Sequence, residues 1–175
     1  MNIAVTILLA SLLGGCAAMQ PAAETPGVAE LRNATGQAVG TAHLAQAGNA
    51  VRLLLEARGL PPGLHAVHIH AVGKCDPPDF TSAGPHFNPG GKQHGALNPQ
   101  GAHAGDLPNI NVGADGNGRL ETATEMITLG TGTTSIWDAD GSALVVHAAP
   151  DDFTTDPTGN AGARIACGVI TKETK

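Results

Sequence analysis

The sequence contains no tyrosine, and aromatic residues make up only 2% of its 175 residues. Charged residues are also scarce, at 14%, which argues against a coiled coil or helical bundle because those folds need repeated Ala, Glu, Lys and Leu. The net charge of −6 without a basic stripe speaks against a nucleic-acid surface. Disorder is not expected either, since 42% of the residues are hydrophobic and can form a core.

Glycine and proline are abundant instead, with 24 and 12 residues, and the eight histidines are concentrated in a few motifs. We therefore expect one compact, loop-rich, all-β domain. Alternating or apolar stretches predict seven strands, at 28–33, 38–45, 49–58, 64–72, 119–125, 143–148 and 164–170. Three long segments, 73–117, 127–142 and 149–163, are expected as loops, and loops of this length in a compact domain are either functional or a sign that the assignment has missed an element.

The N-terminus predicts export. The apolar run at 3–13 is about half as long as a membrane-spanning helix and has the length of a signal-peptide hydrophobic region. It ends in Leu-Gly-Gly-Cys at 13–16, which resembles the bacterial lipoprotein box, where the cysteine is lipidated and begins the mature protein. An ordinary cleaved signal with an incidental Cys16 is the alternative.

The chain is therefore expected to divide into a lipoprotein-type signal peptide at 1–15, a lipid-anchor tether at 16–27 and a folded domain at 28–175. The lipid on Cys16 would hold the protein at a membrane facing the periplasm, and no other membrane contact is expected. If Cys16 carries the lipid, Cys75 and Cys167 remain, and an even pair in an exported chain predicts one disulfide. Two free buried thiols are the alternative.

Histidines at short spacings predict metal binding. His68 and His70 lie two residues apart in a strand pattern, so both side chains leave the same face, while His65 falls on the opposite, core-facing side. Paired imidazoles of this kind suit copper and zinc. Three imidazoles and one carboxylate, the donor set of a closed tetrahedral zinc site, follow in the long loop: His86, His94, His103 and Asp106.

Six motifs in this order make the chain resemble the copper/zinc superoxide dismutase family: GLHAVHIH at 63–70, TSAGPHFNP at 81–89, KQHG at 92–95, HAGDL at 103–107, VVH at 145–147 and GARIACGVI at 162–170. The resemblance implies an all-β, eight-stranded Greek-key β-sandwich or flattened barrel. It also implies an antioxidant oxidoreductase that dismutates superoxide to oxygen and hydrogen peroxide by alternate reduction and oxidation of copper. The cysteine pair Cys75 and Cys167 matches the family's disulfide.

Carried over to matching positions, the resemblance implies two metal sites. Copper, as Cu(II) and Cu(I), would be held by His68, His70, His86 and His147. Zn(II) would be held by His86, His94, His103 and Asp106. His86 would then bridge the two metals through its two ring nitrogens, and it would exchange a proton during the reaction.

Two further side chains belong to the implied site. Arg164 would provide a fixed positive charge and hydrogen-bond donors where the superoxide anion docks. Asp151 would accept hydrogen bonds from His94 and from one copper ligand, either His68 or His70, and the sequence does not decide which. The alternative for Asp151 is a solvated acidic residue.

The chain departs from the family in its last loop, which contains no lysine where many relatives carry guiding positive charges. Lys74 and Lys92 are the candidates to replace them. A competing hypothesis is a copper- and zinc-binding lipoprotein with little turnover. A zinc hydrolase of the metallo-β-lactamase kind would need Asp at Val72, and a purely structural sandwich leaves the ordered ligands unexplained. Superoxide is the only expected partner molecule, and the resemblance is compatible with a homodimer.

Overall fold

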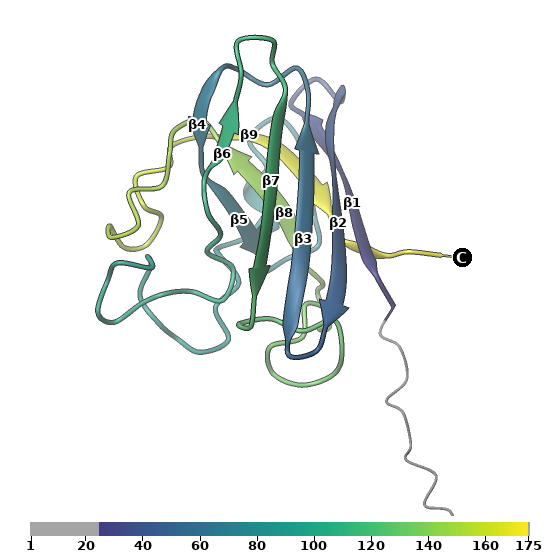
Figure 1. The fold of residues 1–175 in the computed structure, drawn as a ribbon, viewed down its shortest axis with the longest axis vertical. Coiled ribbons are helices and arrows are strands. Elements are labelled where there is room, and N and C mark those ends of the chain that lie inside the picture. The colour runs from purple at the N-terminus through teal and green to yellow at the C-terminus, as the bar shows by residue number, and fades with distance from the viewer. Residues whose placement is uncertain (1–24, 175) are drawn as a thin grey trace, which may run out of the picture.

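The computed structural model describes residues 25–174, which form ten β-strands and one 3₁₀ helix (Figure 1). The strands are β1 (Gly27–Asn33), β2 (Ala38–Ala47), β3 (Ala50–Ala57), β4 (Gly63–His65), β5 (Val67–His70), β6 (Ile110–Val112), β7 (Gly118–Thr124), β8 (Ala143–His147), β9 (Arg164–Val169) and β10 (Thr171–Lys172). The helix, η1, spans Thr81–Ala83. The predicted all-β class is confirmed.

No helix within residues 25–174 has the length and apolar character needed to cross a membrane. The predicted signal peptide, Cys16 and most of the predicted tether lie outside the described residues.

Alternation of apolar and polar residues explains the long strands. In β3, Val51, Leu53 and Leu55 are buried, whereas Arg52 and Glu56 are exposed on the other face. A period of two places one face of the strand against the core and the other in solvent. The strand predicted from this alternation is confirmed, and it pairs with β2 on one side and β7 on the other.

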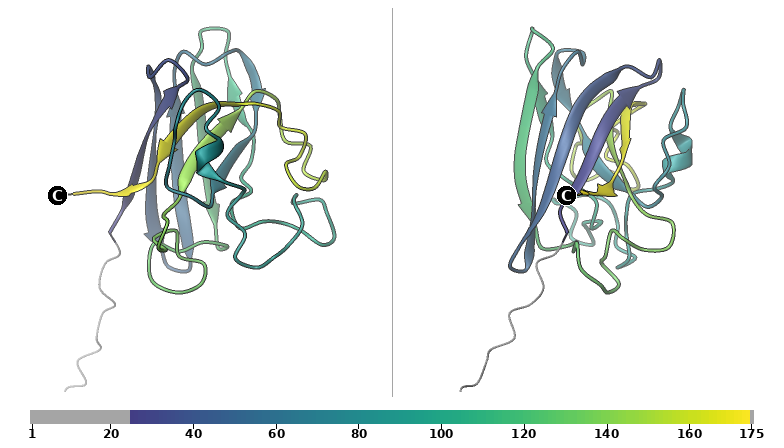
Figure 2. Two further views of the ribbon diagram at one scale, coloured as in Figure 1. Left: turned by 180° about the vertical axis from the view of Figure 1, so that it is seen from behind. Right: turned by 90° about the vertical axis from the view of Figure 1, so that its right-hand side faces the viewer.

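The strands form one antiparallel sheet in the order β4–β6–β7–β3–β2–β1–β9–β8–β5, and β10 pairs with β1. Only Ala66 separates β4 from β5 in the chain, so the two ends of this order meet and the sheet is a nearly closed barrel (Figures 1 and 2). With β4 and β5 counted as one interrupted strand and the two-residue β10 left out, the barrel has the eight implied strands.

The strand predicted at 64–72 is broken at Ala66, which is a correction to the sequence analysis. The N–H of Ala66 donates to the carbonyl of Ala149 (2.9 Å), and its own carbonyl accepts from the N–H of His147 (2.9 Å). These two bonds are not part of the pairing between β4 and β6. They connect the break to the end of β8. Apolar patterning does not reveal such a break, because both halves continue the same alternation.

A short strand also lies inside the segment 73–117, which was expected as a loop. In β6, buried Ile110 and Val112 flank exposed Asn111. Three residues are too few for an alternation to be recognised in sequence. β6 extends the sheet next to β4 and β7, so the first long loop ends earlier than predicted.

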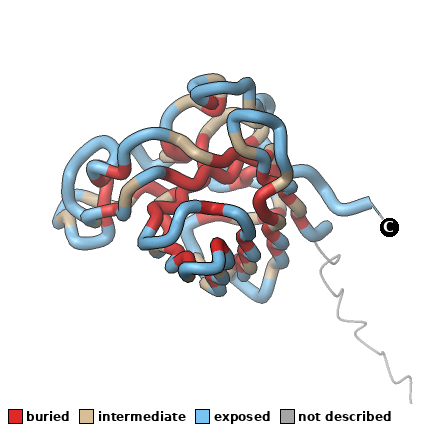
Figure 3. Tube along the Cα trace, turned by 90° about the horizontal axis from the view of Figure 1, so that it is seen from above, coloured by how far each residue is buried: buried red, intermediate tan, exposed pale blue. Residues whose placement is uncertain are grey.

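The two faces of β5 carry different side chains. Val67 and Ile69 belong to the main core inside the barrel, whereas His68 and His70 lie on the outer face, as predicted. Both histidines are nevertheless 0% exposed, because loops cover this face. His65, before the break, is buried as well. Figure 3 shows how buried positions continue from the strands into these loops.

Three long loops connect the later strands: β5 to β6, β7 to β8, and β8 to β9. The first and third extend to the same side of the barrel, on the left in Figure 1. A disulfide between Cys75 and Cys167 joins the first loop to β9, with the Cα atoms 5.6 Å apart. The predicted disulfide is confirmed.

Candidate metal centre

Strand pairing gathers the candidate ligands on both edges of β5. On one edge, β8 pairs with β5 and ends at His147. On the other edge, single antiparallel bridges place His86 beside His70 and Asp106 beside His68. Residues far apart in the chain therefore meet on one outer face of the barrel.

A four-histidine cluster lies on this face and consists of His68, His70, His86 and His147. Their candidate ligand nitrogens all lie within 4.8 Å of one another, and all four side chains are buried. The Nε2 atoms of His70 and His147 are 3.4 Å apart. The structure brings together the four residues that the sequence analysis assigned to copper.

Hydrogen bonds fix which nitrogen of each ring faces the cluster. Nδ1 of His70 and Nδ1 of His147 lie 2.8 and 3.3 Å from main-chain carbonyl oxygens. A carbonyl oxygen only accepts, so these nitrogens carry the proton and leave a lone pair on Nε2. In His68 the two ring nitrogens have the opposite roles: Nε2 donates to Asp151 (2.9 Å), and the buried Nδ1 has no hydrogen-bond partner.

A second group, the Asp106 cluster, consists of Asp106, His86, His94 and His103. The Nδ1 atoms of the three histidines lie 3.0, 3.1 and 3.3 Å, in that order, from Oδ1 of Asp106. Ligands about 2.0 Å from a tetrahedral zinc ion are about 3.3 Å apart, so this spacing fits zinc. The other carboxylate oxygen accepts the N–H groups of Gly95 and His103 at 2.9 and 3.0 Å, which orients Asp106.

His86 belongs to both clusters. Its Nδ1 faces Oδ1 of Asp106 at 3.0 Å, while its buried Nε2 has no hydrogen-bond partner. Nδ1 of His94, in the Asp106 cluster, is also buried without a hydrogen bond. Buried polar atoms are nearly always satisfied, so ring nitrogens of this kind indicate metal ligands. The residues present therefore fit two metal ions that share one imidazole.

His68 also lies close to the Asp106 cluster, since its ligand atom is within 4.8 Å of those of His86, His94 and Asp106. We nevertheless assign His103 to this cluster. Its Nδ1 is 3.4 Å from Nδ1 of His86, which is tetrahedral spacing, and Nε2 of His68 is already engaged elsewhere.

Burial sets the charge of the histidines in the metal-free site. It lowers the pKa of His68 from 6.5 to about 4, that of His70 to about 2 and that of His147 to about 3, because a poorly solvated site disfavours imidazolium. Burial also raises the pKa of Asp106, but its close contacts with His86 and His94 outweigh this effect and hold the pKa well below its usual range. Neutral imidazole and ionised carboxylate are the forms that bind metal.

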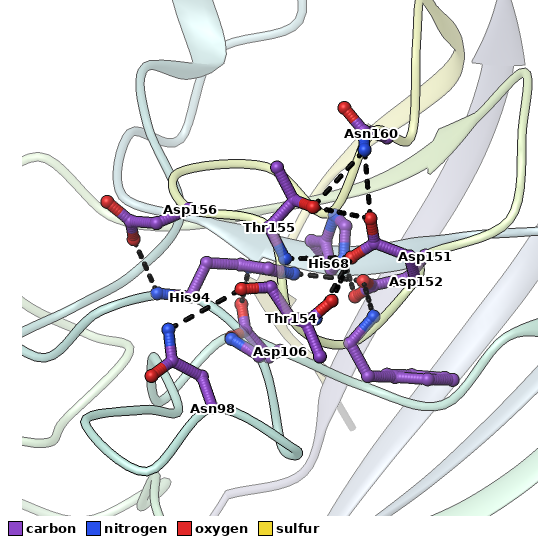
Figure 4. Close-up of polar contacts among 12 residues, drawn as sticks. His68, His94, Asn98, Asp106, Asp151, Asp152, Thr154, Thr155, Asp156 and Asn160 are labelled. Carbon is purple, nitrogen blue, oxygen red and sulfur yellow. Dashed lines mark hydrogen bonds and ion pairs between the residues drawn. The ribbon is translucent and has the colours of Figure 1, made fainter.

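Asp151 links the two clusters (Figure 4). Its Oδ2 lies 2.9 Å from Nε2 of His68 and its Oδ1 lies 2.9 Å from Nε2 of His94, and all three side chains are 0% exposed. His68 rather than His70 therefore shares Asp151 with His94, which resolves the choice left open by the sequence. Asn109 holds the backbone of Asp151, accepting its N–H (2.8 Å) and donating to its carbonyl (3.0 Å).

The sequence analysis missed three residues that support Asp151 and His94: Asn109, Asp156 and Gly159. Asp156 accepts the backbone N–H of His94 at 2.5 Å. Gly159 has φ of 62°, and a Cβ atom there would overlap both Asp151 and His94. Asn, Asp and Gly are ordinary loop residues, so nothing in the sequence distinguishes them.

Arg164 begins β9 directly opposite His147 in the strand register. Its guanidinium donates to the carbonyl oxygens of Phe80 and Gly84, at 2.7 Å each, and the carbonyl of Gly84 also lies 2.8 Å from Nδ1 of His70. Partial burial lowers the pKa of Arg164 from its ordinary value. An arginine still keeps its charge at neutral pH, so the structure places a fixed cation beside the four-histidine cluster.

A pocket open to solvent reaches the four-histidine cluster. Its walls include His86, His147 and two cationic side chains, Arg164 and Lys92. Lys74 is not among the residues that line it. Three carboxylates also line it: Asp138, Asp140 and Asp156. Of the two lysines proposed to attract an anion, only Lys92 is therefore placed at the entrance.

The chain is similar to several known proteins. The family model described as copper/zinc superoxide dismutase (SODC) matches residues 38–170. Superoxide dismutase (Cu-Zn) 1 of Aquifex aeolicus is 51% identical over 144 residues, which cover 81% of this chain and 85% of that protein. Superoxide dismutase (Cu-Zn) of Caulobacter vibrioides is 47% identical over 138 residues, covering 77% and 79%. The crystal structure of a SOD-like protein from Bacillus subtilis matches with a TM-score of 0.78 and 42% identity, covering 81% of this chain and 95% of that one.

Proposed function

The chain belongs to the copper/zinc superoxide dismutase family, and from this premise we propose which of its residues carry out the reaction. It is an oxidoreductase that dismutates superoxide to oxygen and hydrogen peroxide, with copper and zinc as cofactors. A copper- and zinc-binding lipoprotein with little turnover is not favoured, because named dismutases are similar over most of the chain.

We assign the four-histidine cluster to copper and the Asp106 cluster to zinc. Bound copper supplies the one-electron redox chemistry, and zinc, which has no redox chemistry, supplies charge and order. The four-histidine cluster lines the open pocket through His70, His86 and His147, whereas the Asp106 cluster adds only His103 besides the shared His86. This arrangement supports copper at the face that substrate reaches.

His86 is the proposed proton carrier. Its Nε2 faces the four-histidine cluster and is free of hydrogen bonds, while its Nδ1 faces Asp106. We propose that Nε2 takes up a proton in one half of the reaction and delivers it to reduced substrate in the other. Its position on the pocket wall gives that proton a short route to the docked anion.

Arg164 is the proposed docking residue for superoxide. A guanidinium fixed by two main-chain carbonyls offers its remaining N–H groups and its charge to an anion in the pocket. Lys92, on the same wall, adds charge that attracts the anion from solution. Asp138, Asp140 and Asp156 line the same pocket, so the attraction depends on where Arg164 and Lys92 lie beside the histidines and not on the total charge of the pocket or of the chain.

The observation that carries this assignment is the shared ring of His86 between two clusters, in which hydrogen bonds also set the tautomers of His68, His70, His94 and His147. Its test is stepwise metal loading of the metal-free protein. We expect zinc alone to give no dismutation, and activity to rise linearly with copper until one copper per chain is bound. Activity that saturates without copper, or that needs two coppers per chain, would contradict the assignment.

We also propose that 1–15 is a lipoprotein-type signal peptide, 16–27 a lipid-anchor tether and 28–175 the enzyme domain, with Cys16 lipidated and the enzyme held in the periplasm. The disulfide supports export, because such bonds persist in oxidising compartments. The test is the mass of protein extracted from membranes, compared with a Cys16→Ala variant.

A homodimer is the assembly we propose, and analytical ultracentrifugation at several concentrations distinguishes it from a monomer.

A further inference from the structure

Phe80 is buried next to the site but is not part of either metal cluster. It lies in a small second core on the outer side of the barrel, and its side chain is only 2% exposed. The other buried members of this core are Ala83, Ala143, Val145 and Cys167. Cys75, the partner of Cys167 in the disulfide, packs against the same core.

The backbone of Phe80 has an unusual conformation. Its φ is 56°, in the left-handed region that residues with a Cβ atom rarely occupy. In this conformation its carbonyl accepts a hydrogen bond from Nη1 of Arg164 at 2.7 Å and another from the N–H of Ala83 at 3.1 Å. A non-glycine residue stays in this region only where its surroundings hold it there.

Little else ties this part of the loop to the barrel. Asp76 to Asp79 and Thr81 are exposed, and most hydrogen bonds of this turn, such as Asp76 N–H to Ser82 Oγ (2.8 Å), run within the turn itself. One main-chain bond leaves it, from the N–H of Val72 to the carbonyl of Ala83 (3.1 Å). Besides the disulfide, buried Phe80 and its neighbour Ala83 are what anchor the turn against β8 and β9. The ring therefore determines where the Phe80 carbonyl lies.

We infer that Phe80 is a positioning residue for Arg164: burial of its ring fixes the carbonyl that orients the guanidinium toward the four-histidine cluster. The inference rests on the proposed role of Arg164 as the docking residue. The second carbonyl, that of Gly84, is placed separately, because it also lies 2.8 Å from Nδ1 of His70. Without the Phe80 ring, Arg164 would keep one of its two tethers and could rotate about it.

The test is a double-mutant cycle on the full copper- and zinc-loaded protein, with Phe80→Ala, Arg164→Ala and the combined variant. Superoxide decay is measured at equal copper and zinc content. We expect Phe80→Ala to slow decay by about threefold or more in the parent, as for coupled contacting residues, and to have no further effect in the Arg164→Ala background. Equal slowing in both backgrounds would mean that Phe80 acts only on the general fold, and would overturn the inference.

Matched variants separate positioning from loss of stability. Leu129→Ala opens a similar space in the main core, where Leu129 is 3% exposed, and should leave the rate per copper unchanged. Phe80→Leu keeps most of the buried apolar surface and should restore most of the rate. If Phe80→Ala does not fold, the cycle is run with Phe80→Leu and the same non-additivity is expected at smaller amplitude.

A direct readout is the side-chain NMR spectrum of Arg164 in the reduced holoenzyme, in which copper is diamagnetic. Two fixed carbonyl partners should slow rotation about Nε–Cζ and give distinct Nη signals, which Phe80→Ala should merge. Distinct signals in Phe80→Ala would overturn the inference. If Arg164→Ala leaves decay unchanged while the Nη signals still merge, the docking role fails but the positioning of Arg164 by Phe80 stands.

Discussion

The buried carboxylate of Asp151 lies 2.9 Å from Nε2 of His68, across 83 residues of chain. Its other oxygen makes an equal contact with His94, so a single carboxylate orients one ring of each metal cluster. Both rings thereby receive the tautomer that turns Nδ1 toward metal. Asp151 therefore couples the two clusters, and a substitution at Asp151 should change the orientation of one histidine in each.

Replacement of Asp151 by asparagine should weaken zinc binding by about 10- to 100-fold, the usual cost of losing a partner that orients a metal-bound histidine. An amide offers one acceptor in place of two, so His68 or His94 loses its contact. Chelator competition measures the change. Asp152→Asn is the matched control, because Asp152 accepts hydrogen bonds only within the last loop. Equal effects of the two variants would contradict the role of Asp151.

His147→Ala should abolish dismutation and leave zinc bound, because His147 contributes only to the four-histidine cluster. We expect copper affinity to fall by more than the roughly 10–100-fold typical of partners outside the ligand set. Metal analysis after dialysis measures both ions. His103→Ala is the reciprocal variant and should lose zinc first. Equal loss of both metals from His147→Ala would overturn the division of ligands.

Arg164→Ala should slow dismutation by about 10-fold or more without loss of metal, since a hydrogen bond to a charged group contributes about 1.5–3 kcal/mol. Arg164→Lys should recover part of the rate by restoring charge without the two-carbonyl anchor. Rates per bound copper are compared at fixed ionic strength. An unchanged rate in Arg164→Ala would show that the anion docks elsewhere.

Lys92→Ala should lower the rate by about twofold at low ionic strength and flatten its dependence on salt, because Lys92 lines the pocket that the anion enters. The same substitution at Lys74, which does not line the pocket, should change neither. Rates are measured over a series of ionic strengths. A larger effect at Lys74 would assign the attraction of superoxide to a different part of the surface.

The metal-free protein should be most stable near neutral pH. Burial lowers the pKa of His68 from 6.5 to about 4, so its contribution is present above pH 6.5 and is lost as the pH falls through 4. Burial also opposes protonation of His94, but the neighbouring carboxylates of Asp106 and Asp151 raise its pKa to about 9. Its contribution is therefore present below pH 6.5 and is lost as the pH rises through 9.

Urea unfolding of metal-free protein across this pH range measures the effect. His94→Asn should remove the loss on the alkaline side and keep the loss on the acid side. Stability that increases steadily from neutral to alkaline pH would contradict the pairing of His94 with the two carboxylates.

The sequence predicted the long strands and the residues of both clusters for different physical reasons. Strands such as β3 follow from alternation, which reports burial directly. The clusters followed from histidine spacing together with an ordered set of motifs. The break at Ala66 and the three-residue β6 could not be predicted, because each depends on long-range pairing rather than on a local pattern.

The supporting residues were beyond sequence reasoning for a related reason. Asn109 contacts Asp151 across 42 residues of chain, and Gly159 matters because it leaves space beside the Asp151–His94 contact. Phe80 looks like an ordinary loop aromatic in the sequence, and only the structure shows its side chain buried in the second core while its carbonyl holds Arg164. Each of these residues acts through another residue that is distant in the sequence and close only in the folded protein.

The most direct test of the account is superoxide decay after pulse radiolysis, measured on protein of known copper and zinc content before and after copper reloading. The account predicts decay that approaches the diffusion limit and scales with bound copper, at constant zinc. Slow decay from protein that holds one copper and one zinc per chain would contradict it, because the clusters would then bind both metals without turning over superoxide.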